Sequence, residues 1–269
     1  MLEVLRKLAK KKAPPPICSA VIVAAGSARR MEGIDKVLAP LGELPVLVHT
    51  IYSFQDCPRF DEIVVVTRED LLVEVSRICK DFQLDKVSKV VVGGRERTDS
   101  VLAGLREVRP DADLIAIHDG ARPLAPQELA DRGLFAGVLL MPVLPFLEDT
   151  EENVLEVVER AAETGAAAPA IPVTDTVKRA REGLIEETVD RSELWTVQTP
   201  QVFEAGLIRA AVEKAAVDGE SLTDECGAVE RLGMKVSLTT GSKENIKITT
   251  PFDLILGEAI LEARVRGEL

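Results

Sequence analysis

Short apolar runs alternate with amphipathic stretches along the chain from Ile17 onward. The runs are rich in Val, Ile and Ala, a composition typical of strands buried on both faces of a parallel sheet. They cover residues 17–23, 62–67, 89–92, 114–117 and 166–171. Between them, apolar residues recur at helical spacing over residues 45–55, 71–82, 97–108 and 153–163. This alternation predicts an α/β fold with a mostly parallel, twisted sheet and helices on both of its faces.

Two stretches depart from this alternation. Residues 172–195 alternate polar and apolar positions around the turn sequence Arg181-Glu182-Gly183, which predicts a two-stranded arm that projects from the domain. Because an isolated hairpin is only marginally stable in water, we expect the arm to pack on another subunit. Residues 124–145 are apolar but are interrupted by prolines and glycines, so the pattern assigns them neither helix nor strand.

The first 16 residues differ from the rest of the chain. Five Lys and Arg residues stand against one acidic residue between positions 1 and 12, and three prolines follow at 14–16. We interpret residues 1–16 as a basic tail and a stiff linker, and residues 17–269 as the domain. A solvated tail is the expected state, and a short basic helix that touches a membrane or a partner is the alternative.

Composition narrows the classes of function. The chain has 269 residues with a formal net charge of -12, which argues against nucleic acid as a partner, because a phosphodiester backbone would be repelled. No apolar run approaches the roughly 20 residues of a membrane span, so no stable membrane association is expected. The cysteines lie far apart without a CxxC pair, which indicates reduced thiols and a cytoplasmic location. They are Cys18, Cys57, Cys79 and Cys226.

The loop after the first strand is the most informative segment. Ala24, Ala25 and Gly26 carry little side-chain bulk, so their backbone N–H groups can approach a ligand closely. Arg29, Arg30 and Lys36 follow at once and supply the positive charge that suits a triphosphate. The spacing fits neither GxGxxG nor GxxxxGK[ST]. The alternative is an ordinary glycine turn with solvated charges.

Two further polar segments follow predicted strands, at the edge where ligands bind in parallel sheets. Asp119 follows the fourth strand, and one carboxylate there is enough to hold Mg²⁺ against substrate phosphates, although an aspartate that caps the loop is the alternative. His118 beside it is expected to be packed rather than to act as a base. Gly93 and Gly94 leave room for a flat base, and Ser100 can hydrogen-bond it.

The C-terminal quarter offers further candidates. Lys247 is placed in an apolar strand, where an ammonium needs a ligand or a carboxylate to face. Thr250 and Pro251 are typical of the start of a helix, and Asp253 is assigned to that structure rather than to a site. Three more residues lie in polar turns that could face a site: Arg191, Thr199 and Asp224.

Seven blocks of sequence carry a family resemblance. They are AAGSARRM (24–31) with Lys36, GGRERTDSV (93–101), HDGARP (118–123), PVTDTVK (172–178), TVDRSELWTVQTPQVF (188–203), TDE (223–225) and ENIKIT (244–249). In this order they resemble the 2-C-methyl-D-erythritol 4-phosphate cytidylyltransferases of the non-mevalonate isoprenoid pathway. The resemblance implies a Rossmann-like nucleotidyltransferase domain and a homodimer in which the arm completes the neighbouring site.

The resemblance also implies roles for single residues. Cytidine would be held by Ala24, Ala25, Gly26, Gly94 and Ser100. Arg30 and Lys36 would bind the β- and γ-phosphates of CTP, Asp119 would bind Mg²⁺, and Lys247 would stabilise the α-phosphate during attack. The methylerythritol phosphate would be held by Arg122, Thr176, Arg191, Thr199 and Asp224. The substrate phosphate would attack the α-phosphorus in line, and pyrophosphate would leave.

Three departures from the family pattern keep alternatives open. Ala28 stands where the family usually has glycine, and Arg95 stands where an aspartate is often seen. Residues 124–145 look like an insertion, interpreted as a surface excursion or as a lid or interface. The alternatives are a cytidylyltransferase for ribitol 5-phosphate or another sugar phosphate, and an inactive homologue that only binds nucleotide.

Overall fold

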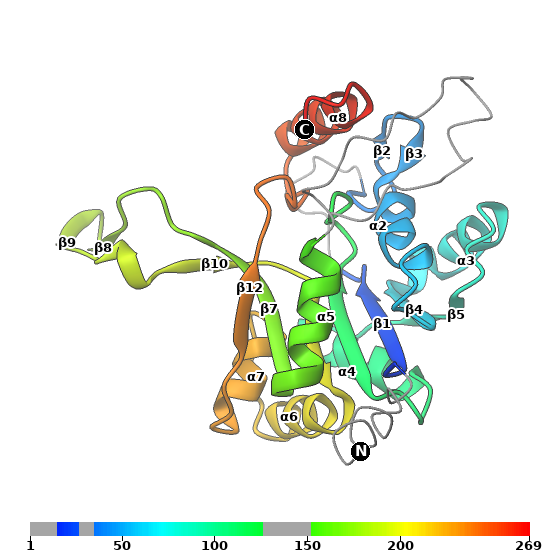
Figure 1. Ribbon diagram of the computed structural model, residues 1–269, viewed down its shortest axis with the longest axis horizontal. Coiled ribbons are helices and arrows are strands. Elements are labelled where there is room, and N and C mark those ends of the chain that lie inside the picture. The colour runs from blue at the N-terminus through cyan, green and yellow to red at the C-terminus, as the bar shows by residue number, and fades with distance from the viewer. Residues whose placement is uncertain (1–14, 27–34, 126–151) are drawn as a thin grey trace, which may run out of the picture.

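An eight-stranded sheet runs through the molecule with helices on both faces (Figure 1). The computed structural model describes residues 15–26, 35–125 and 152–269. Across the sheet the strands follow the order β10 (Trp195–Val197), β7 (Ala166–Pro172), β11 (Gln201–Glu204), β6 (Leu114–Asp119), β1 (Cys18–Val23), β4 (Glu62–Thr67) and β5 (Val87–Val92). A further strand, β12 (Ser237–Thr240), pairs with β7.

The pairing is parallel at the centre and mixed at one side. β1 pairs in parallel with β4 and β6, and β4 pairs in parallel with β5. β11 is antiparallel to both of its neighbours, β6 and β7, and β10 is antiparallel to β7. The predicted single α/β domain with a mostly parallel sheet is confirmed.

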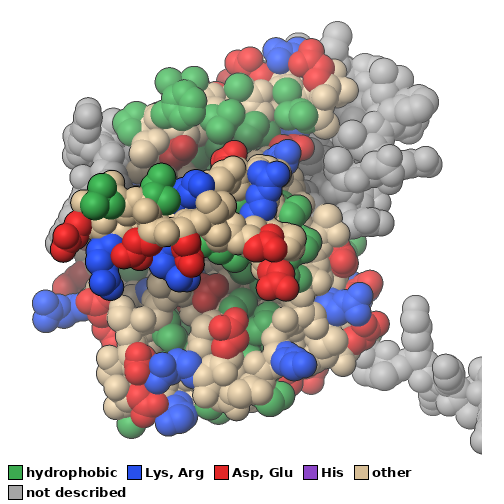
Figure 2. Space-filling model, turned by 90° about the vertical axis from the view of Figure 1, so that its left-hand side faces the viewer, with side chains coloured by type: hydrophobic (Ala, Val, Ile, Leu, Met, Phe, Trp, Pro, Cys, Tyr) green, Lys and Arg blue, Asp and Glu red, His purple; other side chains and the backbone are tan. Residues whose placement is uncertain are grey.

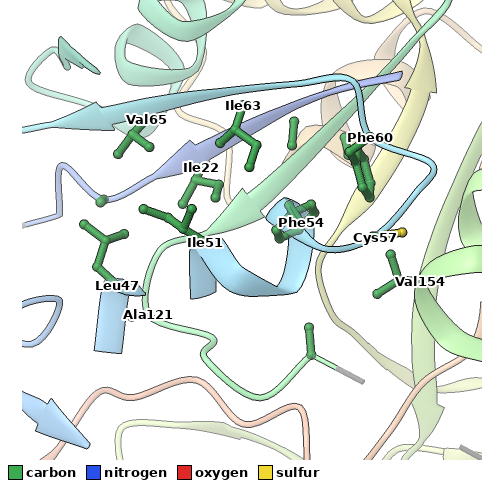
Figure 3. Packing of buried hydrophobic residues seen from close by; sticks show 14 of the residues in the cluster. Ile22, Leu47, Ile51, Phe54, Cys57, Phe60, Ile63, Val65, Ala121 and Val154 are labelled. Atoms are coloured by element: carbon green, nitrogen blue, oxygen red, sulfur yellow. The ribbon is translucent and has the colours of Figure 1, made fainter. Parts of the chain in front are cut away.

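Side chains alternate between two cores, one on each face of the sheet. From β1, Ala20 and Ile22 join the first core, while Val21 joins the second. The first core is covered by α2 (Val46–Gln55), α3 (Leu72–Asp81), α5 (Glu152–Thr164) and α8 (Pro251–Val265). Figure 3 shows its packing, with Ile22 and Val65 of the strands lying against Leu47 and Ile51 of α2.

The second face carries α4 (Arg97–Glu107), α6 (Ala205–Val217) and α7 (Glu225–Arg231). Helix α4 lies close to β1 and β4 because Gly104 presents no side chain there. A Cβ at Gly104 would lie 2.4 Å from Cγ1 of Val21 and 2.8 Å from Cγ2 of Val66. Shorter elements complete the fold: β2 (Pro40–Leu41), β3 (Leu44–Pro45), η1 (Glu69–Leu71) and η2 (Arg191–Glu193).

An antiparallel ribbon projects from the domain where the arm was predicted (Figure 1). Its strands are β8 (Lys178–Arg181) and β9 (Leu184–Thr188). Glu182 and Gly183 between them have φ of 53° and 82°, the two positive values that a tight hairpin turn requires. The ribbon is exposed along both strands, so it contributes to neither core of the domain.

The predicted elements and the observed ones differ at one important place. Lys247 was predicted to lie in an apolar strand, and this is wrong: β12 ends at Thr240 and the chain from there to Thr250 is irregular. The helix start is confirmed, because Thr250 and Asp253 form a capping box and Pro251 is the first residue of α8.

Some predictions fall outside the described residues. These are the basic tail up to residue 14, Ala28, Arg29 and Arg30, and residues 126–145 of the predicted insertion. Within the described ranges, the structure contains no helix that is long and apolar enough to cross a membrane.

Candidate active site

Three predicted ligand loops meet at one edge of the sheet. The backbone N–H of Ala24 donates to the carbonyl of Val66 at 2.7 Å, and that of Gly120 donates to the carbonyl of Val23 at 2.9 Å. Gly93 likewise donates to the carbonyl of Thr67 at 2.8 Å. These bonds extend the ladders of β1, β4 and β6 by one residue, so the loops begin side by side.

The loops approach each other closely because their residues are small. A Cβ at Gly93 would lie 2.6 Å from the Cβ of Ala25, and one at Gly120 would lie 2.8 Å from the Cβ of Ala24. Lys36 reaches the same place, since its Nζ lies 3.7 Å from the position of a Cβ on Gly26. The small residues predicted for a nucleotide site therefore lie together with Lys36 beside them, and their contact with a nucleotide stays a prediction.

Gly94 of the second loop is joined to Ser100 of α4. The N–H of Gly94 donates to Oγ of Ser100 at 3.2 Å, and the Ser100 hydroxyl donates to the carbonyl of Glu96 at 3.2 Å. Glu96 and Asp99 form the capping box that starts α4. A Cβ at Gly94 would lie 2.1 Å from the Cβ of Asp99, so only glycine fits this loop conformation.

Asp119 lies at the centre of a cluster of cations. Its Oδ1 accepts from Nη1 of Arg97 at 2.6 Å, and its Oδ2 is 2.7 Å from Nζ of Lys247 and 3.6 Å from Nε of Arg122. Burial alone would raise the pKa of Asp119, but the charges of Arg97 and Lys247 outweigh it and hold the pKa well below its usual range. The side chain is thus a buried carboxylate paired with cations, not a cap on loop amides.

Lys247 has the carboxylate partner that the sequence required. Its side chain is 39% exposed whereas that of Asp119 is 8% exposed, so the ammonium lies at the open side of the cluster. The irregular segment that carries Lys247 is anchored by the N–H of Ile248, which donates to the carbonyl of Ala121 at 2.8 Å. The backbone around Lys247 is therefore fixed to the loop that follows Asp119.

Arg97 and Glu225 form a part of the site that sequence reasoning missed. Nε and Nη2 of Arg97 donate to Oε1 and Oε2 of Glu225 at 2.9 and 2.8 Å. Both residues lie in blocks that carry the family resemblance, 93–101 and 223–225. They are 128 positions apart along the chain, so no local pattern pairs them. One feature of the sequence could have indicated Arg97: it is a cation in the first turn of a helix, directly after a predicted ligand loop.

His118 is buried and hydrogen-bonded, as expected from the sequence. Its Nδ1 lies 3.0 Å from Oγ1 of Thr199, and its Nε2 lies 3.1 Å from the carbonyl of Arg122. The carbonyl can only accept, so Nε2 carries the proton and Nδ1 accepts from the Thr199 hydroxyl. Burial lowers the pKa of His118 to about 4, so the ring is neutral at physiological pH.

The residues predicted for the second substrate divide into two groups. Arg122 and Thr199 touch the Asp119 cluster: Nη1 of Arg122 donates to the carbonyl of Asn245 at 2.6 Å, and Oγ1 of Thr199 accepts from the N–H of Asp119 at 3.1 Å. Asp224 is close by along the chain, next to Glu225, and caps α7 by accepting from the N–H of Gly227 at 3.0 Å.

Thr176 and Arg191 belong to the arm and form the second group. Thr176 is exposed at the base of the ribbon, and Nη1 of Arg191 donates to the carbonyl of Thr174. Within the described part of the chain, no hydrogen bond or ion pair joins either residue to the Asp119 cluster. Their contact with a substrate of this subunit or of a neighbour stays a prediction.

The chemistry of the cluster can be compared with the needs of Mg²⁺. The described residues contain no group of three His, Cys, Asp or Glu side chains placed to share an ion. Mg²⁺ is commonly held by one or two carboxylates together with substrate phosphates and water. Asp119 supplies one ionised carboxylate, and Oδ2 is the oxygen that Lys247 would have to share. The residues fit such an ion only in company with substrate oxygens.

Comparison with known proteins gives a consistent result. The model of the family described as 2-C-methyl-D-erythritol 4-phosphate cytidylyltransferase matches residues 18–140 and 144–263. The matched span thus includes much of 124–145, and whether these residues are an insertion stays a prediction. The enzyme of that name from Halalkalibacterium halodurans is 39% identical over 249 residues, covering 92% of this chain and 98% of its own.

Other relatives and solved structures agree. The Dehalococcoides mccartyi (strain 195) protein of the same name is 40% identical over 244 residues, covering 90% of this chain and 95% of its own. The crystal structure of 4-diphosphocytidyl-2C-methyl-D-erythritol synthase from Anaerococcus prevotii superposes with a TM-score of 0.74 at 28% identity, over 92% of this chain and 99% of that one. The Thermus thermophilus cytidylyltransferase gives a TM-score of 0.65 at 29% identity, over 91% and 98%.

Proposed function

The chain belongs to the 2-C-methyl-D-erythritol 4-phosphate cytidylyltransferase family, and from this premise we propose how its residues divide the work of the reaction. The enzyme transfers CMP from CTP to 2-C-methyl-D-erythritol 4-phosphate. A phosphate oxygen of the alcohol phosphate forms a bond to the α-phosphorus of CTP as the bond from that phosphorus to the β-phosphate bridging oxygen breaks. The products are 4-diphosphocytidyl-2-C-methyl-D-erythritol and pyrophosphate.

The small residues at the sheet edge form the cytidine site in this proposal. Gly94 and Ser100 line one side, and their hydrogen bond fixes the loop before a ligand arrives. Ala24, Ala25 and Gly26 line the other side, where the N–H of Ala24 is bonded to the carbonyl of Val66 and fixes the start of the loop. Support comes from the close packing of the two loops, since a Cβ at Gly93 would lie 2.6 Å from the Cβ of Ala25 and 2.7 Å from Oγ of Ser100.

In this proposal each cation near the site binds a particular phosphate of CTP. Lys247 stabilises the α-phosphoryl oxygens as negative charge builds on them, and Lys36 and Arg30 bind the β- and γ-phosphates. Preplaced cations of this kind favour the transition state over the ground state. Mg²⁺, held by Asp119, would neutralise part of the triphosphate charge. This chain's own contribution is to keep Asp119 ionised and to hold Lys247 beside it.

The second substrate is placed on the side of Arg122, Thr199 and Asp224, with Thr176 and Arg191 contributed by an arm. We infer a homodimer in which arms are exchanged. The arm exposes Leu184 and Ile185, which are 74% and 66% exposed. Figure 2 looks onto the side from which the arm projects and shows hydrophobic side chains on the arm and on α8 above it. A cytoplasmic location agrees with the substrates.

One observation carries the proposal: the 2.7 Å pair of Lys247 and Asp119 lies at the sheet edge where the glycine and alanine loops meet. The test is pyrophosphate release from CTP with Mg²⁺ and 2-C-methyl-D-erythritol 4-phosphate, with ribitol 5-phosphate in a parallel reaction. Release with the first substrate alone is expected. Pyrophosphate release with ribitol 5-phosphate instead would indicate a cytidylyltransferase for a different substrate. No release with either substrate would indicate a protein that only binds nucleotide.

A further inference from the structure

Arg97 bridges two buried carboxylates in the floor of the site. Its Nε and Nη2 donate to Glu225, and its Nη1 donates to Oδ1 of Asp119 at 2.6 Å. The side chain of Glu225 is 2% exposed, and within the described residues its oxygens accept only from Arg97. A carboxylate buried to this degree is a poor source of stability, because desolvation offsets most of the attraction. The pair therefore needs an explanation in terms of function.

The bridge connects three parts of the chain that surround the substrates. Arg97 is the first residue of α4, directly after the loop of Gly94; Asp119 ends β6; and Glu225 starts α7. The guanidinium is planar, so its two bonds to Glu225 fix the direction of Nη1. Oδ1 of Asp119 is thereby held by Arg97, and Oδ2 is left to Lys247 at 2.7 Å and Arg122 at 3.6 Å.

We propose that Arg97 is a positioning residue for the transfer reaction, clamped by Glu225, which orients the carboxylate of Asp119 so that Oδ2 alone faces Lys247 and the substrates. The inference rests on the proposed function and adds two residues to it. Arg97 acts through Asp119, because each of its three nitrogens donates to Glu225 or Asp119 and the bond from Nη1 ends on the Asp119 carboxylate. Its loss should therefore lower turnover while leaving CTP affinity largely intact.

The decisive variant replaces both members of the clamp, Arg97→Gln with Glu225→Gln, in the full chain. It removes the two opposite charges together, so no single charge is left buried without its partner, and the two amides can still hydrogen-bond each other. We expect kcat to fall about tenfold to hundredfold, the range found when residues that orient a ligand are lost. KM for CTP, and the Kd for CTP measured by calorimetry in EDTA, should stay within about threefold of the wild-type values.

The control is Arg209→Gln. Arg209 contacts the carbonyls of Leu105 and Val108 at the far end of the same helix, away from the substrates. Its kcat should equal that of the wild type. If the double variant does not fold, two single variants replace it: Glu225→Gln, which keeps the charge of Arg97 but weakens its clamp, and Arg97→Lys, which keeps the charge but cannot bridge both carboxylates. Both should lower kcat at unchanged KM for CTP.

Wild-type kcat in a folded double variant, or in both single variants, would overturn the role of Arg97. A CTP Kd weakened tenfold or more at unchanged kcat would also overturn it, because Arg97 would then bind the nucleotide rather than position Asp119. Failure of the proposed function looks different. In that case the wild-type enzyme itself releases no pyrophosphate, whereas the positioning role fails only through the variants.

Discussion

Nζ of Lys247 lies 2.7 Å from Oδ2 of Asp119, so the cation assigned to the α-phosphate and the carboxylate assigned to the metal ion are ion-pair partners. The lysine is fixed by this contact on the open side of the cluster, while Arg97 pairs with the other oxygen, Oδ1, and Arg122 lies 3.6 Å from Oδ2. A group that is already in place needs no reorganisation when charge develops in the transition state. The contact also predicts what single substitutions should do.

Lys247→Ala should lower kcat about 10²- to 10³-fold, because one preplaced cation at the α-phosphate is lost. The fold should survive, since the lysine side chain is 39% exposed. Lys214→Ala is the matched control: Lys214 pairs with Asp218 at 2.9 Å on the outside of α6. Steady-state pyrophosphate release measures both variants. Near-normal turnover of Lys247→Ala would remove this lysine from the mechanism.

Thr199→Val should both destabilise the protein and slow the reaction. The hydroxyl accepts from the N–H of Asp119 and donates to His118, so its loss leaves two buried polar groups without a partner. The expected loss of stability is about 1–3 kcal/mol per unsatisfied group. Thr196→Val is the control, because its hydroxyl is exposed and donates to the carbonyl of Ile171 at the surface. Urea unfolding compares them, and equal midpoints would refute the prediction.

Gly104→Ala tests the close packing of α4 on the sheet. The new methyl group would lie 2.4 Å from Cγ1 of Val21, which forces the helix away from β1 and should destabilise the fold by about 1–3 kcal/mol. Gly227→Ala in α7 serves for comparison, since its methyl group would meet only Oδ1 of Asp224 at 3.5 Å. That variant should be as stable as the wild type or slightly more stable, because alanine favours helix. Thermal unfolding decides between them.

Three of the four cysteine thiols, those of Cys18, Cys79 and Cys226, should be unreactive in the folded protein. Burial raises the pKa of Cys18, Cys79 and Cys226, that of Cys79 to about 11, so the reactive thiolate is disfavoured. A thiol-specific chromogenic reagent at pH 8 should react with these residues only after unfolding in guanidinium. Rapid reaction of the folded chain would contradict this prediction.

The raised pKa values of these thiols also make the stability of the fold depend on pH. The folded pKa values are raised above 9.0, the ordinary value, so the unfolded chain releases these protons first as the pH rises. This contribution to stability is complete below pH 9 and declines above it. Replacing all three residues with alanine should therefore reduce the drop in urea midpoint between pH 8 and pH 10. An identical drop in both proteins would show that other groups cause it.

Ile185→Asp at the tip of the arm should disrupt the proposed dimer. The substitution places a charge on a side chain that is 66% exposed in one subunit and that contributes to neither core. Each subunit of the variant should therefore still fold. Its mass, measured by light scattering, should fall from that of a dimer to that of a monomer. If the arms complete neighbouring sites, turnover should fall with the dimer fraction. Val73→Asp, at an exposed position on α3, is the control.

The sequence was sufficient for the parallel half of the sheet. Strands such as β4 (Glu62–Thr67) are continuous apolar runs bounded by polar residues, and this pattern depends only on burial of both faces. The position of Asp119 at a strand end followed from the same rule. β11, with the sequence QVFE, has no such signature, because its place between β6 and β7 depends on partners far away along the chain.

Other features required the folded chain. The segment around Lys247 alternates Ile246, Lys247 and Ile248 as a strand would, but Ile248 is buried against the first core without a ladder partner. The pairing of Arg97 with Glu225 spans 128 positions, and nothing local marks either residue as the other's partner. The pattern of apolar and polar residues indicates whether a segment is buried. Contacts such as that of Arg97 with Glu225 depend on which distant segments the fold brings together.

The base of the arm leads directly into the Asp119 cluster. β10 is held to β7 by rungs that end at Val197 opposite Ala170, and Thr199 follows two residues later with its hydroxyl on the backbone of Asp119. Gln198 is thus the one residue between the last paired residue of β10 and Thr199. The arm and the Asp119 cluster are therefore joined by one continuous stretch of backbone that is bonded to the sheet on both sides of Gln198.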